Sequence, residues 1–262
     1  MRLVTMPEMS KKELDRAMSL ETEKHFSLDP ARIITGYCSI YPDPVNKEAS
    51  ASHYLLTSVE KEISDAYGRL ALEAGLIPRA IEIAPLALIR SLNHVRKITF
   101  PEKRSARLLL DCGNQSTTLT LAVSNEYRAH RSFNLGIEDF KNAARSSKIR
   151  MEKNSSGERP AYKKVSLEEK SLQELAGKLG KNINESLDYW IDKGDLQENN
   201  LPPLEVCGGG IFIPGLPSSL KTILNHDLIL YNPLKGLSSK MSGHEGALFQ
   251  IAHGLALRGW RK

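Results

Sequence analysis

Apolar runs and alternating positions divide the middle of the chain into three predicted strands. A continuous apolar run, Leu108–Leu110, ends at Asp111 and Gly113. Alternation of apolar and polar residues resumes over residues 119–123 and, after a turn, over residues 127–133. These patterns predict a β-hairpin followed by a third strand, with a carboxylate at the first bend.

Apolar residues spaced three and four apart predict the helices. Ser10 followed by Glu13, and Thr57 followed by Glu60, form capping-box patterns that predict two helix starts. The longest predicted helix begins at Ser166, and its apolar stripe either packs against a sheet or binds a partner. The predicted helices cover residues 10–25, 57–74, 86–93, 137–144, 166–191, 217–225 and 246–257, and further strands are predicted at 1–5, 33–40, 53–57, 80–84, 204–207 and 228–231.

Two bends carry residues suited to a phosphate-bearing ligand. At the first, a tight turn would point backbone N–H groups into one concavity, and Asp111 could hold a metal ion or a water beside an anion. Alternatively, Asp111 caps an ordinary turn. At the second, the predicted strand 204–207 runs into Gly208, Gly209 and Gly210. Glycines in series let a backbone approach a flat ligand closely, because no Cβ intervenes.

Length and composition exclude several classes of protein. The chain of 262 residues is long enough for one large domain or two lobes. Cys38, Cys112 and Cys207 are widely spaced, and we interpret them as buried thiols of a reducing compartment, not as a disulfide framework or a metal site. We find no signal peptide and no apolar run near the roughly twenty residues of a membrane span. We therefore expect a cytosolic protein that reaches a membrane only through a partner.

The net charge of +5 comes from one segment. Residues 141–164 contain eight basic and two acidic residues, so the rest of the chain is close to neutral. The segment is polar and contains Gly157 and Pro160, which is typical of an inserted solvated loop. Alternatively, it contacts anionic lipid or an acidic partner. Nucleic-acid binding is not expected.

The two bends resemble loops of a known superfamily. Asp111-Cys112-Gly113 with Thr117 is similar to the second phosphate loop of the actin-like ATPases, and Gly208–Gly210 with residues 214–216 is similar to their adenosine loop. Other segments narrow the resemblance to the type IV pilus assembly protein PilM family, which is related to the bacterial division protein FtsA. These segments are residues 3–10, 74–76, 87–90, 186–189 and 254–258.

The resemblance implies an α/β fold, the actin-like (ribonuclease H-like) two-lobed fold with an α+β insert subdomain. Residues 1–50 would form the insert subdomain, 51–104 the rest of the first lobe, and 105–262 the second lobe, with a helical and basic insertion at about 137–200. The resemblance also implies ATP and Mg²⁺ as ligands. The implied nucleotide-binding residues are Asp111, which would act on Mg²⁺ indirectly, Gly113, Thr117, Gly208, Gly209 and Gly210.

The implied nucleotide cleft lacks one of its two phosphate loops. Proteins of the superfamily clamp the phosphates between two similar loops, and no stretch before Arg107 fits the first of them. We therefore expect an N-terminally incomplete first lobe. Losing the hydrogen bonds of that loop would cost about 5 kcal/mol, which turns micromolar ATP binding into roughly millimolar binding.

Two functions of different classes follow from the resemblance. The first is a cytoplasmic scaffold of the type IV pilus platform, peripheral to the inner membrane, in pilus biogenesis and twitching motility. It would bind the cytoplasmic tail of a PilN-like membrane protein and other platform or motor proteins, and it could self-associate. The second is an ATPase or small-molecule kinase, which needs both phosphate loops and a carboxylate base. Asp111 is the one candidate base in the sequence, so the scaffold is the favoured interpretation.

Overall fold

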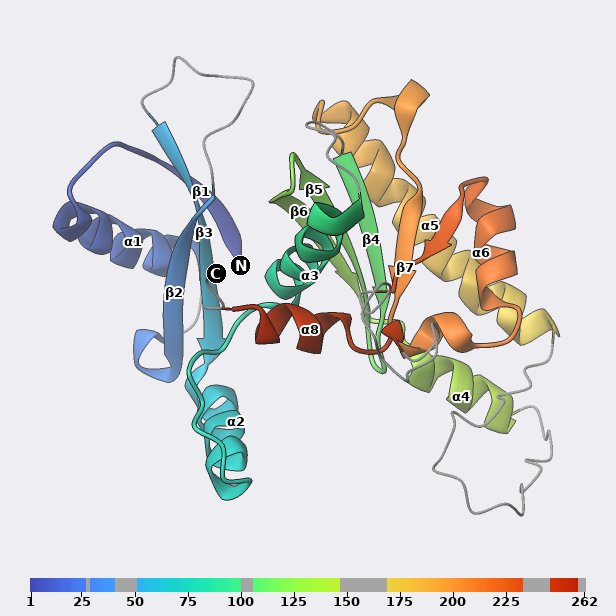
Figure 1. Ribbon diagram of the computed structural model, residues 1–262, viewed down its shortest axis with the longest axis horizontal. Helices are drawn as coiled ribbons and strands as arrows, with labels where there is room; N and C mark the ends of the chain where they lie inside the picture. The colour runs from blue at the N-terminus through green and yellow to red at the C-terminus, as the bar shows by residue number, and fades with distance from the viewer. Residues whose placement is uncertain (27–28, 41–50, 100–105, 147–168, 233–245, 259–262) are drawn as a thin grey trace. The chain divides into compact units, whose positions relative to one another are not determined.

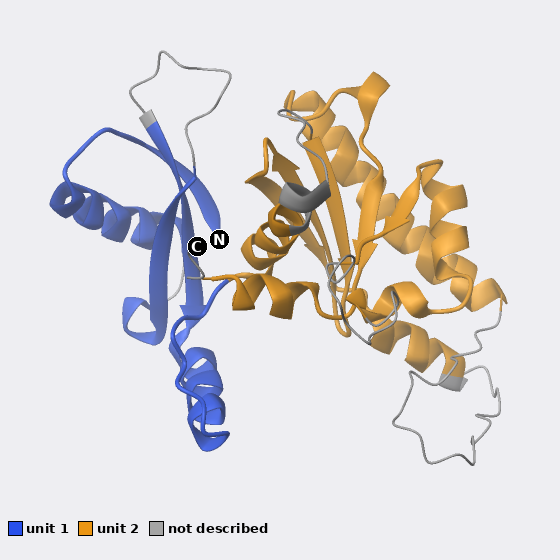
Figure 2. Cartoon of the chain, viewed as in Figure 1, with its two compact units in different colours: residues 1–82 blue, residues 83–262 orange. Residues whose placement is uncertain are grey.

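The computed structural model describes residues 1–26, 29–40, 51–99, 106–146, 169–232 and 246–258. The chain divides into two compact units, unit 1 from Met1 to Glu82 and unit 2 from Ile83 to Lys262 (Figure 2). The basic residues between 147 and 164 and the predicted helix start at Ser166 lie outside the described residues. The expected domain boundaries at residues 50 and 104 stay predictions.

Unit 1 is a three-stranded antiparallel sheet with two helices (Figure 1). The central strand β3 pairs with β1 along one edge and with β2 along the other. The elements are β1 (Arg2–Pro7), α1 (Lys11–His25), a 3-10 turn η1 (Pro30–Arg32), β2 (Ile33–Ile40), β3 (Ala51–Glu60) and α2 (Lys61–Glu73).

The predicted capping box at the start of α1 is confirmed. The Ser10 backbone N–H donates to the Glu13 carboxylate at 2.9 Å, and the Ser10 side chain accepts from the Glu13 N–H. Such reciprocal bonds satisfy two N–H groups that a helix start otherwise leaves without partners. Leu14 and Met18 of α1 are then buried against the sheet.

Three local predictions for this part of the chain are wrong. Thr57 does not cap a helix, because it lies in β3, where its hydroxyl donates to the Gly36 carbonyl at 2.9 Å. Residues 80–83 do not form a strand, and α3 begins at Ala84. In the described part of the chain no strand lies beside residues 80–83, and an extended segment becomes a strand only by pairing. Cys38, expected to be buried, is exposed on the edge strand β2.

Unit 2 is built on a five-stranded sheet in the order β6-β5-β4-β7-β8. The hairpin pairs are antiparallel, whereas β7 runs parallel to both of its neighbours. The strands are β4 (Ala106–Cys112), β5 (Thr117–Val123), β6 (Glu126–Phe133), β7 (Leu204–Cys207) and β8 (Leu228–Leu230). The helices are α3 (Ala84–Thr99), α4 (Ile137–Ser146), α5 (Glu169–Asp192), α6 (Leu216–Leu224) and α8 (Gln250–Ala256), with 3-10 turns η2 (Glu198–Asn200) and η3 (Gly209–Phe212).

Successive residues of β4 belong to two different cores, which makes unit 2 a three-layer structure. Leu108 and Leu110 pack into the large core that α5 and α6 cover. Leu109 packs on the opposite face with Leu88 and Leu92 of α3. Figure 1 shows α5 and α6 on one side of the sheet and α3 and α8 on the other. Because side chains alternate along a strand, Asp111 lies on the same face of the sheet as Leu109.

The apolar stripe of α5 packs into the core of unit 2, which confirms the first of its two interpretations. Its buried members are Leu172, Ala176, Leu179, Ile183, Leu187 and Trp190. Trp190 is among the largest fully buried side chains of the described residues. No helix in the described ranges is both long and apolar enough to cross a membrane.

The two glycines of α5 should respond differently to alanine. A Cβ at Gly177 would meet no atom within 4 Å, so we expect Gly177→Ala to raise the free energy of unfolding by about 1 kcal/mol through helix propensity. A Cβ at Gly180 would lie 2.5 Å from Cγ2 of Ile223 in α6, so Gly180→Ala should lose that gain to steric repulsion. Urea unfolding of both variants checks this, and equal stabilisation by both would contradict the observed α5–α6 packing.

Candidate functional site

The two predicted bends meet at one edge of the unit 2 sheet. Parallel pairing of β4 with β7 places Asp111 directly beside Cys207. Both strands therefore end at the same edge, and the turn after β4 lies next to the glycine patch after β7. Ligands of open α/β sheets bind outside the carboxyl ends of the strands.

Asp111 is a largely buried carboxylate at that edge. It shares a sheet face with Leu109, and the Cys207 thiol donates a long hydrogen bond of 3.9 Å to its Oδ1. Burial raises the pKa of Asp111 above its ordinary value and outweighs the opposing effect of the hydrogen bond from Cys207. A nearby cation would favour the charged form of this carboxylate.

Gly208 is required at its position for two separate reasons. Its φ of +81° lies in the left-handed region that favours glycine. A Cβ there would also lie 2.5 Å from Oδ1 of Asp111 and 2.5 Å from the carbonyl oxygen of Cys112. The N–H of Gly208 donates to the Ala247 carbonyl at 3.0 Å. The glycine patch therefore contacts the carboxylate bend directly.

The neighbouring glycines continue this close approach. Gly209 opens the 3-10 turn η3, and Gly210 is buried against β4. A Cβ on Gly210 would lie 2.7 Å from Cβ of Cys112. Gly210 thus allows η3 to pack closely against the end of β4.

The turn after β4 is held by α4 and by Thr117. The Gly113 N–H donates to the Ser116 carbonyl at 2.9 Å, which closes the turn. Thr117, expected to face a phosphate, is buried and donates its hydroxyl to the Leu135 carbonyl at 2.8 Å. Thr117 therefore holds the turn from its buried side, and Asn114 and Gln115 form the exposed tip of the turn.

Gly136 is a site-supporting residue that sequence reasoning did not single out. A Cβ at this position would lie 2.4 Å from the Asn114 carbonyl oxygen. The first N–H groups of α4, from Ile137 and Glu138, donate to the carbonyls of Gly113 and Asn114 at 3.1 and 2.9 Å. The sequence signal was a glycine directly before an amphipathic helix, but only the fold shows that the first residues of this helix form hydrogen bonds with the turn.

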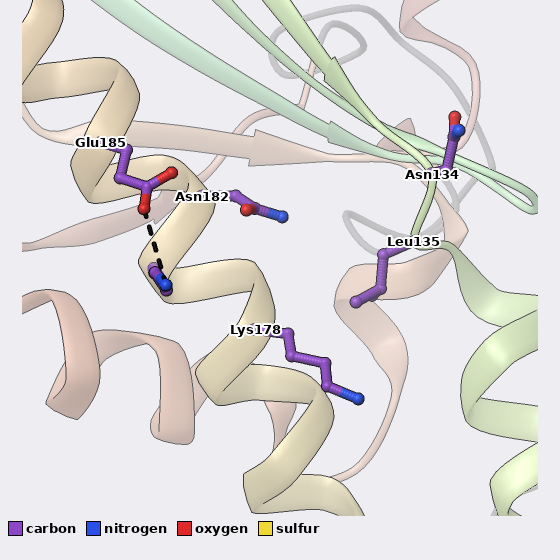
Figure 3. A pocket seen from close by; sticks show the side chains of 6 residues that line it. Asn134, Leu135, Lys178, Asn182 and Glu185 are labelled. Atoms are coloured by element: carbon purple, nitrogen blue, oxygen red, sulfur yellow. Dashed lines mark ion pairs between the residues drawn. The ribbon is translucent and has the colours of Figure 1, made fainter.

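A hollow of about 340 Å³ opens beside Leu135, whose carbonyl anchors Thr117. Figure 3 shows Lys178 and Asn182 of α5 extending toward Leu135 across it. Its lining residues are Asn134, Leu135, Lys178, Lys181, Asn182 and Glu185. The volume is within the range of small-molecule pockets, and the lining offers amide and charged groups for a polar ligand.

The carboxylate bend fits a hydrated Mg²⁺ better than a directly coordinated metal. Among the described residues no group of three His, Cys, Asp or Glu side chains could hold a metal ion. Mg²⁺ usually keeps several waters and takes one or two protein carboxylates plus phosphate oxygens. Asp111 is such a carboxylate, and an added cation would favour its ionised form against the burial that raises its pKa.

Asp111→Asn should stabilise the ligand-free protein at neutral pH. The folded-state pKa of Asp111 is raised, so its stabilising contribution is complete below its ordinary value of 3.8 and is lost as pH rises through the folded pKa. Asparagine resembles the protonated acid and does not ionise, so the variant should unfold later than the unmodified chain at pH 7 and show no advantage near pH 3. Thermal unfolding from pH 3 to 8 measures this. A variant less stable than the unmodified chain at pH 7 would contradict it.

The whole chain is similar to proteins of pilus assembly. The family model described as "Type IV pilus assembly protein PilM" matches residues 1–260. Among solved structures, a chain of the "PilM-PilN type IV pilus biogenesis complex" is 23% identical, with 100% of this chain and 76% of that chain covered and a TM-score of 0.79. A search of curated proteins found no match.

A second solved structure shares the fold at lower similarity. It is the ethanolamine utilization protein EutJ from Carboxydothermus hydrogenoformans, 16% identical, with 77% of this chain and 62% of that chain covered and a TM-score of 0.52. Likenesses at this identity concern the fold alone. The actin-like α/β fold expected from the sequence is confirmed.

Proposed function

This chain belongs to the type IV pilus assembly protein PilM family, and from this premise we propose that it is a scaffold that binds the cytoplasmic tail of a PilN-like membrane protein. Through that tail it would sit at the cytoplasmic side of the inner membrane and connect it to other platform or motor proteins. The observation that carries the proposal is the similarity over the whole chain to a chain of the PilM–PilN complex.

We further propose that Mg²⁺ and ATP bind at the edge formed by β4 and β7. Asp111 would hold the hydrated metal, and the backbone of Gly113 and of the glycine patch would approach the nucleotide. Support comes from the buried carboxylate next to Gly208 and Gly210, where no Cβ fits. Nucleotide bound there would stabilise the structure and would not be a substrate.

Binding of the tail can be measured directly. A fluorescein-labelled peptide with the sequence of a PilN-like cytoplasmic tail should show saturable anisotropy when titrated with the protein. A scrambled peptide of the same composition should not. An equal anisotropy response to both peptides, or no response to either, would refute the proposed partner.

Gly208→Ala should weaken stabilisation by Mg-ATP. The unmodified chain should unfold at a higher temperature in millimolar Mg-ATP, because a ligand that binds only the folded state stabilises it by mass action. The added Cβ would meet Asp111 and Cys112 at 2.5 Å, so the variant should show at least a tenfold weaker apparent affinity in the same thermal-shift titration.

Gly177→Ala is the matched control for this experiment. It makes the same chemical change in α5 at a position with nothing within 4 Å, and it should leave the nucleotide-dependent shift unchanged. The nucleotide proposal fails if Gly208→Ala keeps the full shift. Phosphate release at about 1 per second or more would instead favour the enzyme interpretation.

A further inference from the structure

Two histidines meet where α8 packs on α3. The rings of His94 in α3 and His253 in α8 lie edge to face, with their centroids 5.3 Å apart. Nδ1 of His253 also forms a hydrogen bond of 2.8 Å with the hydroxyl of Ser91, which is fully buried. Figure 1 shows the two helices side by side on one face of the unit 2 sheet. The contact therefore contains two half-buried groups that can gain a proton near neutral pH.

The two helices offer no counter-charge to a protonated histidine. The sequences of α3 and α8 contain no aspartate and no glutamate. Arg90 of α3 adds a fixed positive charge, and it donates from Nη1 to the Gly254 carbonyl at 3.0 Å. A proton on one histidine ring opposes a proton on the other, since like charges at this distance repel. The contact is therefore most stable when both rings are neutral.

The sheet beneath the helices does not supply the missing charge. Its titratable and charged groups on this face are Tyr231, Glu205, Arg107, Asp111 and His130. Glu205 is already paired with Arg107. The Tyr231 hydroxyl lies 3.3 Å from the Ser91 hydroxyl, and burial raises its pKa, so it stays neutral. The pKa of His253 is lowered by burial and then by the charge of His94, and no carboxylate of the described residues raises it.

Hydrogen bonds connect α8 to the glycine patch. The Gly208 N–H donates at 3.0 Å to the carbonyl of Ala247, which lies just before α8. At the first residue of α8, the buried Gln250 donates from its side-chain amide to the Tyr231 carbonyl at 3.0 Å. The Tyr231 N–H donates in turn to the Val206 carbonyl of β7 at 2.9 Å. A shift of α8 therefore acts on the end of β7 and on the glycine patch.

We propose that the His94–His253 pair is a pH-sensitive switch, in which protonation under mildly acidic conditions releases α8 from α3 and breaks the hydrogen bond that holds Gly208. The direction follows from the lowered pKa of His253. Its stabilising contribution is complete above the ordinary value of 6.5 and is lost as pH falls through the folded-state pKa. The consequence for Mg-ATP rests on the nucleotide site proposed above, whereas the release of α8 does not.

Amide hydrogen exchange measured by NMR at about pH 7.5 and about pH 5.5 tests the switch. Protection factors, which remove the intrinsic pH dependence of exchange, should fall about tenfold or more at the lower pH for the amides of α8 and for Gly208. Protection of α5 should stay unchanged, because α5 covers the other face of the sheet. Unchanged protection of α8, or an equal fall in α5 that marks global unfolding, would overturn the proposal.

His253→Gln should remove the response to pH. Glutamine can still form a hydrogen bond with Ser91 but does not titrate, so α8 protection should be the same at both pH values, whatever its level. His130→Gln is the matched control, because burial also lowers the pKa of His130, which bonds Tyr127 outside the α3–α8 contact. This variant should keep the full loss. A pH response that survives His253→Gln, or that disappears with His130→Gln, would contradict the assignment to the histidine pair.

A thermal-shift titration with Mg-ATP at the same two pH values separates this inference from the proposed function. The shift should be lost at the lower pH in the unmodified chain and persist there in His253→Gln, a comparison that cancels protonation of ATP itself. No shift at either pH in either chain would refute the nucleotide site and leave the exchange result as the test of the switch. A full shift at the lower pH while α8 is released would overturn the connection between α8 and the glycine patch.

Discussion

Glu205→Gln should lower the free energy of unfolding by about 3 to 5 kcal/mol, because it removes the negative charge that pairs with a buried guanidinium. Arg107 of β4 and Glu205 of β7 form this pair, with Nε of Arg107 donating to Oε1 of Glu205 at 2.7 Å. Their side chains are only 9% and 14% exposed. The pair joins the two strands that carry the candidate site, so its loss should also loosen the glycine patch. Urea unfolding monitored by far-UV circular dichroism measures the change.

An exposed ion pair in the same unit provides the control. Glu174 and Lys178 of α5 pair at 2.8 Å, and both side chains are mostly exposed. Glu174→Gln should cost less than about 1 kcal/mol, since solvent screens such pairs. Equal effects of the two substitutions would show that burial does not set the strength of the Arg107–Glu205 pair.

Gly254→Ala should detach α8 from α3 and lower the free energy of unfolding by about 3 kcal/mol. A Cβ at Gly254 would lie 1.8 Å from the carbonyl oxygen of Ala87, a backbone atom that cannot rotate away. The helices would have to separate. That would break the hydrogen bond of 2.8 Å between Ser91 and His253 and the bond of 3.0 Å from Arg90 to the Gly254 carbonyl.

Amide hydrogen exchange locates this effect. Protection of the α8 amides should fall while that of α5 stays high, because the two helices cover opposite faces of the sheet. Leu255→Ala, on the exposed side of α8, should leave α8 protected. Native-like protection of α8 in Gly254→Ala would contradict the observed helix crossing.

These two positions show why prediction from sequence reached some features of the site and not others. Gly254 was part of a family-like segment, and Gly208 was part of a glycine patch, so the sequence singled out both residues. It did not show why glycine is needed there, because the atoms that exclude a Cβ belong to Ala87 and Asp111, which are far away in the chain. Thr117 illustrates the same limit: its type matched a phosphate loop, but its hydroxyl bonds the Leu135 carbonyl.

By itself the sequence determined the strands β4 to β6, the capped start of α1, the apolar stripe of α5 and the family of the chain, because periodicity and capping are local properties. Only the tertiary structure decided which other elements each helix and strand contacts. Among the residues that the structure describes, it left 80–83 without a partner strand, turned the large side chains of α2 outward, and buried Asp111 beside Gly208. Burial and strand pairing are contacts between residues distant in sequence, and a linear pattern does not contain them.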